Sequence, residues 1–156
     1  MRIVLMGVSG CGKSAVGLAL SQALHLPFFD GDTYHSSANQ TKMSKGIPLT
    51  DRDRQPWLEA LSHLLQEHPS MILACSALKA SYRSYLNRVS EVTFIYLKGD
   101  LSLIRERIEK RPGHFFDSSL LESQFALLEE PQDAFVIDIT PPVPEIVQEI
   151  RKLLKK

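Results

Sequence analysis

Short apolar runs recur along the chain and alternate with longer stretches in which hydrophobic residues return every three or four positions. The runs are nearly continuous, whereas a strand with one face in water would alternate apolar and polar residues. Such runs predict strands of a parallel sheet that helices cover on both faces. We therefore expect an α/β fold, a three-layer parallel sheet of about five strands at residues 2–6, 27–29, 71–75, 92–97 and 134–139.

The stretches between the runs carry apolar stripes with the spacing of core-facing helices. Asp100 can cap the start of one helix, and Thr50 with Asp53 has the spacing of a capping box for another. Pro56 would then lie deep inside that second helix, where proline is unfavourable, so the start of this helix stays open. The stripes consist of Ala15, Val16, Leu18, Ala19, Ala23 and Leu24, then Leu58, Leu61, Leu64 and Leu65, then Leu101, Ile104 and Ile108.

Composition narrows the class of protein. The 156 residues fit one domain, so we expect a single domain over residues 1–156. Eighteen basic and eighteen acidic residues leave no net charge, which argues against a nucleic acid partner. No apolar run approaches the roughly 18 residues of a membrane span, and two cysteines are too few for a disulfide framework. The reducing cytoplasm fits these features best.

Residues 7–14, GVSGCGKS, match the phosphate-loop pattern G-x-x-x-x-G-K-[ST] in full and lie between a predicted strand and a predicted helix. In this pattern backbone N–H groups turn toward nucleotide phosphates, Lys13 supplies a mobile cation and Ser14 supplies a hydroxyl ligand for Mg²⁺. We expect ATP and Mg²⁺ as cofactors, and we expect the Cys11 side chain to point outward without chemistry of its own. The expected nucleotide-binding residues are Gly7, Val8, Ser9, Gly10, Cys11, Gly12, Lys13, Ser14 and Ala15.

A phosphate loop identifies phosphate binding and not a type of reaction. A glycine-rich turn without a ligand is the alternative, which the flanking strand and helix disfavour. The chain has no N-K-x-D motif to read guanine, and no apolar run ends in the Asp-Glu pair typical of many ATPases. A small kinase is the interpretation that remains.

Two carboxylates follow the second predicted strand, at the edge of the sheet where open α/β folds bind ligands. Asp32 is the candidate for orienting or deprotonating an acceptor hydroxyl, and Asp30 is the candidate for holding Mg²⁺ through water. The two aspartates could exchange these roles, and an Asp-Gly turn with solvated carboxylates is the alternative.

Further motifs share one order and spacing over nearly the whole chain. They are MGVSGCGKS, DGDTYH, Asn39, Lys42-Met43, Lys45-Gly46, PLTDRDRQPW, CSALK, Tyr82-Arg83, YLKGD, RPGHFF and QF-x-x-LE-x-P. In these motifs the chain resembles the gluconate kinase family, although Ser36 stands where a proline commonly follows the histidine. The resemblance implies a fold like nucleoside monophosphate kinases, a homodimer, and transfer of the ATP γ-phosphoryl group to the 6-hydroxyl of D-gluconate.

Phosphoryl transfer depends on positioning and on charge neutralisation, so Lys13, Mg²⁺ and a mobile arginine should carry most of the catalysis. Gluconate has a carboxylate, and its pocket therefore needs cations and hydrogen-bonding groups. The candidates are Arg54, Lys79, Arg83 and His35, with Arg54 the best for the carboxylate. Each cation could instead be a solvated surface charge, and His35 could be a structural histidine.

Residues 107–130 have the features of a lid. A helix with Arg107 reaches Arg111, and the Pro112-Gly113 pair then breaks it before His114. In related kinases a lid closes over ATP, excludes water and brings arginines to the transferring phosphoryl group. Arg111 is our first candidate for that catalytic arginine and Arg107 the second, both also binding the nucleotide, while His114 would contact the substrate. An ordinary helix end with basic residues is the alternative.

Two other functions stay open. One is a related kinase for another small hydroxy acid, such as shikimate, or for a nucleotide. The other is a nucleotide-binding regulator that has lost turnover. The acceptor-side motifs argue against the first, and the second finds no support in the intact set of Lys13, Ser14, Asp30, Asp32 and Arg111.

Overall fold

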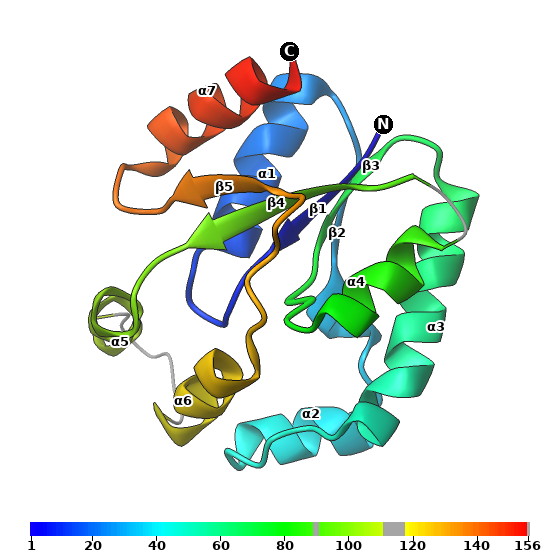
Figure 1. Ribbon diagram of the computed structural model, residues 1–156, viewed down its shortest axis with the longest axis vertical. Coiled ribbons are helices and arrows are strands. Elements are labelled where there is room, and N and C mark those ends of the chain that lie inside the picture. Colours follow the sequence, from blue (N-terminus) through cyan, green and yellow to red (C-terminus); the bar gives the residue numbers. More distant parts are fainter. Residues whose placement is uncertain (89–90, 111–117, 156) are drawn as a thin grey trace.

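The computed structural model describes residues 1–88, 91–110 and 118–155 (Figure 1). Its sheet has five parallel strands in the order β2-β3-β1-β4-β5. The strands are β1 (Arg2–Met6), β2 (Phe28–Asp30), β3 (Met71–Ala74), β4 (Thr93–Lys98) and β5 (Phe135–Asp138). The helices are α1 (Lys13–Leu24), the 3-10 helix η1 (Gly31–Tyr34), α2 (Ser37–Ser44), α3 (Asp51–Glu67), α4 (Ala80–Asn87), α5 (Leu101–Glu109), α6 (Ser118–Leu127) and α7 (Val143–Leu154).

The predicted fold class is confirmed, since helices cover both faces of a parallel five-stranded sheet (Figure 1). Every strand begins and ends within one residue of its predicted range. The continuous apolar runs were a reliable signal because the inner strands have no face in water. All four residues of β3, for example, are buried.

Alternate residues of β1 face two separate hydrophobic clusters, one on each side of the sheet. Ile3 and Leu5 belong to the cluster that α1 and α7 cover, whereas Val4 and Met6 belong to the cluster under α3 and α4 (Figure 1). Successive side chains of a strand point to opposite faces, so this one strand joins both cores. The sheet thereby gives a rigid base to the loops that follow its strands.

Helix α3 begins with the predicted capping box. The Thr50 hydroxyl accepts the Asp53 N–H and the Asp53 carboxylate accepts the Thr50 N–H, each at 3.0 Å. The helix continues through Pro56, which settles the boundary that the sequence left open. Its start places Arg54 in the first turn, where the side chain is buried.

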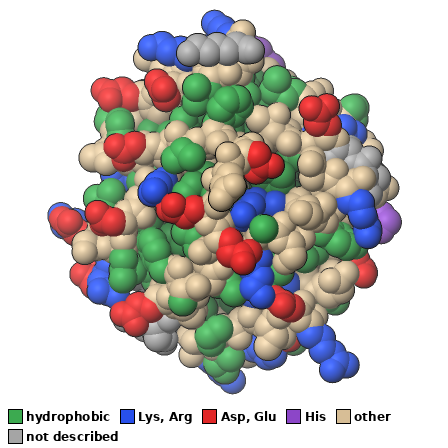
Figure 2. Space-filling model, viewed as in Figure 1, with side chains coloured by type: hydrophobic (Ala, Val, Ile, Leu, Met, Phe, Trp, Pro, Cys, Tyr) green, Lys and Arg blue, Asp and Glu red, His purple; other side chains and the backbone are tan. Residues whose placement is uncertain are grey.

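The surface agrees with the balanced composition. Basic and acidic side chains are interspersed on the face of the molecule that Figure 2 shows, in keeping with the zero net charge of the chain. In the described ranges, none of the helices combines the length and the hydropathy that a membrane span requires.

Candidate active site

The phosphate loop connects β1 to α1 and needs glycine at its first position. Gly7 has φ of +150°, and a Cβ there would lie 2.7 Å from the Cys11 sulfur and 3.0 Å from the Leu97 carbonyl oxygen. The thiol of Cys11 fills the space under the loop, and the residue is 1% exposed. The expectation that Cys11 points outward is therefore wrong, because the tight turn leaves room for a small apolar side chain beneath it.

The start of α1 is suited to an anion. Its N-cap residue, Gly12, has φ of +99° and offers no side chain to accept the first N–H groups of the helix, and the first turn contains no acidic residue. Those N–H groups and the helix dipole are thus available to a phosphate. Lys13 adds a cation at the same place, with its ammonium donating to the carbonyl oxygens of Gly7 at 2.8 Å and Val8 at 3.0 Å.

Oxygen donors suitable for Mg²⁺ lie beside this helix start. The Ser14 hydroxyl donates to the Asp30 carboxylate across 3.1 Å, and the other oxygen of that carboxylate accepts the Asp32 N–H at 3.0 Å. A hydroxyl and an oriented carboxylate, both reachable from solvent, are the hard oxygen ligands that Mg²⁺ prefers. The residues present therefore fit a magnesium ion bound at Ser14 and Asp30.

Asp32 faces the phosphate loop from η1. Its carboxylate reaches water at the mouth of the cleft, while protein surrounds it on the other sides. This partial burial raises the pKa of Asp32, an effect that the nearby Lys13 cation opposes and the Asp30 carboxylate reinforces. A carboxylate with a raised pKa accepts a proton more readily than an ordinary aspartate does, which suits a general base.

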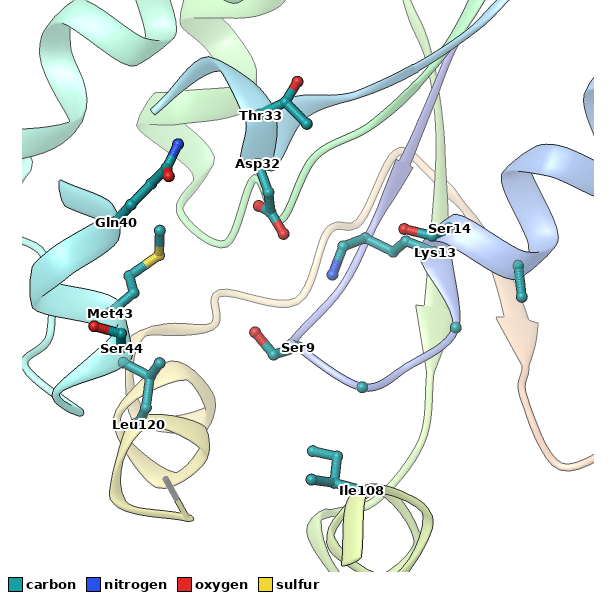
Figure 3. Close-up of a pocket in the computed structure, with 13 residues that line it drawn as sticks. Ser9, Lys13, Ser14, Asp32, Thr33, Gln40, Met43, Ser44, Ile108 and Leu120 are labelled. Carbon is teal, nitrogen blue, oxygen red and sulfur yellow. The ribbon is translucent and has the colours of Figure 1, made fainter. Parts of the chain in front are cut away.

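A cavity of about 580 Å³ lies between the phosphate loop and α2 (Figure 3). Lys13 and Asp32 both point into it, from α1 and η1, and Ser9 faces them from the loop. The cavity thus joins the phosphate-binding elements to the candidate acceptor residues. Its lining consists of Ser9, Gly10, Gly12, Lys13, Ser14, Ala15, Asp32, Thr33, Gln40, Met43, Ser44, Ile108 and Leu120.

A smaller pocket opens beside the same residues, and we call it the inner pocket. It shares Lys13 and Asp32 with the large cavity and adds two of the predicted substrate residues, His35 and Arg54. The structure therefore brings together groups from α1, η1 and α3 that are far apart in the sequence. The inner pocket is lined by Ser9, Lys13, Asp32, His35, Met43, Leu49, Arg54, Ser76, Leu120 and Gln124.

Arg54 is a buried cation with neutral partners. Its guanidinium donates to the Leu49 carbonyl at 2.5 Å and to the Tyr82 hydroxyl at 3.4 Å. Among the described residues, no carboxylate lies within ion-pair distance of it. The Asp51 carboxylate feels the Arg54 charge through space, but its direct partners are Lys79 and Tyr82. A buried cation without a directly paired carboxylate is unfavourable, so the inner pocket favours an anionic ligand.

His35 stacks on the indole ring of Trp57, with 4.3 Å between ring centroids and 13° between ring planes. Burial, together with the nearby Arg54 cation, lowers the pKa of His35 to about 4. The imidazole is therefore neutral near pH 7, and it meets a ligand in the inner pocket as a hydrogen-bonding group and not as a cation.

Two of the basic side chains predicted to bind the substrate, Lys79 and Arg83, have partners within the protein. Lys79 pairs with the Asp51 carboxylate at 3.0 Å, next to Tyr82, whose hydroxyl also donates to Asp51. The Arg83 guanidinium donates to three backbone carbonyls, those of Ala77, Leu78 and Glu129 at 2.7, 3.1 and 2.8 Å, and it lines a separate cavity beside α4. Lys79 is thus engaged by Asp51 and does not line the inner pocket, and Arg83 anchors the connection between β3 and α4.

The predicted lid residues are only partly described. Arg107 lies on α5 and donates to the Thr140 carbonyl at 3.3 Å, so it reaches toward the connection between β5 and α7. Arg111 and His114 lie outside the described residues. The lid at residues 107–130 therefore stays a prediction.

Sequence reasoning gave no role to Gln124, a residue of α6 that contacts the phosphate loop. Its side-chain oxygen accepts the Ser9 N–H at 2.7 Å, and its amide nitrogen donates to the Ser9 hydroxyl at 2.9 Å. The only sequence signal was the QF-x-x-LE-x-P motif, in which Gln124 stands first. A contact between residues so distant along the chain requires the folded structure.

Comparison with known proteins places this site in a family. The family model for shikimate kinase matches residues 9–155. The thermoresistant gluconokinase of Escherichia coli K12 is 43% identical, over 98% of this chain and 93% of that protein. A solved gluconokinase structure from Sinorhizobium meliloti 1021 superposes with a TM-score of 0.91 at 43% identity, covering 99% of this chain and 93% of that one. The chain belongs to the gluconokinase family.

Shikimate kinase is a more distant relative of this gluconokinase-family chain. The enzyme from Aquifex aeolicus superposes with a TM-score of 0.68 at 20% identity, covering 99% of this chain and 96% of that one. Identity at that level indicates a common fold alone. The predicted resemblance to the gluconate kinase family is confirmed by the relatives that are about 40% identical over nearly the whole chain.

Proposed function

We propose that this protein transfers the γ-phosphoryl group of ATP to the 6-hydroxyl of D-gluconate, giving 6-phospho-D-gluconate and ADP. The observation that carries the proposal is the buried Arg54, whose direct hydrogen-bond partners are neutral and which lines a pocket that opens beside the phosphate loop. A sugar acid would supply the missing carboxylate, and its hydroxyl chain could reach from Arg54 toward Asp32. Membership of the gluconokinase family selects gluconate among such acids.

The phosphate loop would bind ATP. Backbone N–H groups at the start of α1 would donate hydrogen bonds to the phosphate oxygens, and the Lys13 ammonium would leave the carbonyls of the loop for the β- and γ-phosphates. Ser14 and Asp30 would hold Mg²⁺, which neutralises negative charge on the phosphate oxygens when bound. The two residues already hydrogen-bond to each other, so little rearrangement is needed.

On the acceptor side, Asp32 would orient the 6-hydroxyl and take its proton during transfer. Its position on η1, opposite Lys13, and its raised pKa both support this role. Arg54 would bind the carboxylate of gluconate, and His35 would hydrogen-bond to one of its oxygens. Lys79 and Arg83 would contribute through their neighbours, because their charged groups are engaged by Asp51 and by backbone carbonyls.

The remaining expectations belong to the same proposal. Residues 107–130 would form a lid that brings Arg111 to the transferring phosphoryl group, with Arg107 at the nucleotide and His114 near the substrate. The 156 residues would make one kinase domain that works as a cytoplasmic homodimer. The absence of a nucleic acid partner remains part of the proposal, and charges of both signs are mixed on the face that Figure 2 shows.

A kinase for another hydroxy acid is the second candidate, because the shikimate kinase model matches most of the chain. A panel of acceptors separates the two: ADP release with Mg²⁺ and ATP should be selective for gluconate over shikimate, other sugar acids and nucleoside monophosphates. Turnover of another acceptor alone would reassign the inner pocket. Nucleotide binding without turnover of any acceptor would favour an inactive regulator.

A further inference from the structure

The amide group of Asn39 has its orientation fixed by a backbone carbonyl. Asn39 lies on α2 and is buried, and its side-chain nitrogen is 2.8 Å from the Asp53 carbonyl oxygen. A carbonyl oxygen can only accept, so the atom at this position is the amino nitrogen of the amide. The same nitrogen lies 3.3 Å from Nδ1 of His35.

This geometry determines where the proton of the imidazole ring resides. The amino group has two hydrogens, and one is given to Asp53. The second is directed to Nδ1 of His35, which must then be an acceptor and carry no proton. In a neutral imidazole the proton is therefore on Nε2, the ring nitrogen for which the described residues supply no partner.

Several neighbours keep the ring in this state. Trp57 packs flat against it, and the indole N–H donates to the Gly31 carbonyl at 2.7 Å, which fixes the indole in turn. The charged groups that share the inner pocket with His35 are Arg54, Lys13 and Asp32, and two of the three are cations that oppose a protonated ring. The Asp53 carboxylate is occupied by Lys42 and by the Thr50 N–H.

We propose that Asn39 is a positioning residue that holds His35 as the neutral tautomer protonated on Nε2. The ring then offers an N–H donor to the substrate that receives the phosphoryl group. This inference rests on the proposed function for the identity of the acceptor. A fixed donor selects substrates that place an oxygen opposite Nε2 of His35. A site built in this way rejects analogues that lack this oxygen. It also leaves proton removal to Asp32, because the ring nitrogen that could act as a base is engaged by Asn39.

The direct test is ¹⁵N NMR of the histidine rings in the full chain, with the His35 signals assigned by their loss in His35→Gln. Between about pH 5 and pH 8, His35 should show a protonated Nε2 and an unprotonated Nδ1. A protonated Nδ1 or a cationic ring in that interval would overturn the inference. This readout needs no turnover, so it stays informative if gluconate proves not to be the acceptor.

Asn39→Asp tests the consequence for the substrate. A carboxylate cannot donate to Nδ1, so the ring should move its proton to Nδ1 and lose the Nε2 donor. We expect KM for gluconate to rise at least about tenfold, with KM for ATP nearly unchanged. His35→Gln tests rescue of the donor: its amide nitrogen can replace the Nε2 donor, so KM for gluconate should rise less in this variant than in Asn39→Asp.

Thr41→Asp is the matched control, because it adds the same charge to an exposed position of α2. Unchanged KM for gluconate in Asn39→Asp, with the NMR signals showing a shifted proton, would contradict the positioning role. An equal rise of KM in Thr41→Asp would assign the effect to charge alone and would contradict it as well.

Discussion

At the scale of single residues, the site depends on where charges are left without a counter-ion. Lys79 and Arg54 both lie near the Tyr82 ring, yet Lys79 has the Asp51 carboxylate as a partner and the direct partners of Arg54 are neutral. An anion binds more strongly to a buried cation that lacks a directly paired carboxylate than to a cation that already has one. Arg54 should therefore dominate recognition of the gluconate carboxylate.

Arg54→Gln should raise KM for gluconate roughly 10-fold to 100-fold, as expected for the loss of a hydrogen bond to a charged group worth about 1.5 to 3 kcal/mol. KM for ATP should change little, because Arg54 does not line the large cavity beside α1. Steady-state kinetics with each substrate varied in turn makes the measurement. Arg52→Gln, at an exposed position of the same helix, is the control, and an equal rise of KM there would contradict the assignment.

Asp32→Asn should lower kcat about 10²-fold to 10⁴-fold, the usual range for a general base. The melting temperature should stay the same or rise slightly, because the raised pKa of Asp32 means that its ionised form is disfavoured in the folded protein. Kinetics and thermal unfolding are compared with those of Asp133→Asn, an exposed surface change. Retention of near-normal kcat in Asp32→Asn would remove the residue from the catalytic role.

At the scale of elements, the short connections after the strands bring the site together. The phosphate loop follows β1, η1 follows β2, and α3 presents Arg54 from its first turn. The capping box at Thr50 decides where α3 begins, and a shift of that start would turn Arg54 away from the inner pocket. One local motif thus positions a residue of the site.

Thr50→Ala should lower the free energy of unfolding by about 1 kcal/mol, which is typical for the loss of a helix N-cap. It should also weaken gluconate binding, because Arg54 follows the cap directly. Chemical denaturation and gluconate kinetics can be measured on the same preparation. Thr41→Ala, an exposed threonine within α2, serves as the comparison, and unchanged stability in Thr50→Ala would show that the box is dispensable.

At the scale of the whole molecule, the sequence was a good guide to the fold and to the phosphate loop. The inner strands are buried on both faces, so their apolar runs stand out in the sequence, and the loop is a contiguous motif. Partners that depend on tertiary packing could not be predicted. Arg83 donates to the Glu129 carbonyl and Gln124 bonds to Ser9, each across a long stretch of chain.

Global stability should depend on pH through His35. Its pKa is lowered from 6.5 to about 4 in the folded protein, so between these values the unfolded chain binds more protons. Stability should be unaffected by this group above pH 6.5 and should fall on acidification toward pH 4, with a slope of up to about 1.4 kcal/mol per pH unit. Unfolding free energies measured across this range would show the slope.

His35→Gln should make that acid dependence shallower, because glutamine does not titrate. His63→Gln, on the exposed side of α3, should leave it unchanged. An identical pH dependence in wild-type protein and His35→Gln would mean that other groups control the stability in acid.

The most direct test of the proposed function is ADP release with Mg²⁺ and ATP in the presence of gluconate, compared with shikimate, other sugar acids and nucleoside monophosphates. Selective turnover of gluconate, abolished in a folded Lys13→Ala protein, is the predicted result. Turnover that prefers another acceptor, or a Lys13→Ala protein as active as the wild type, would contradict the proposed function and the role of the phosphate loop respectively.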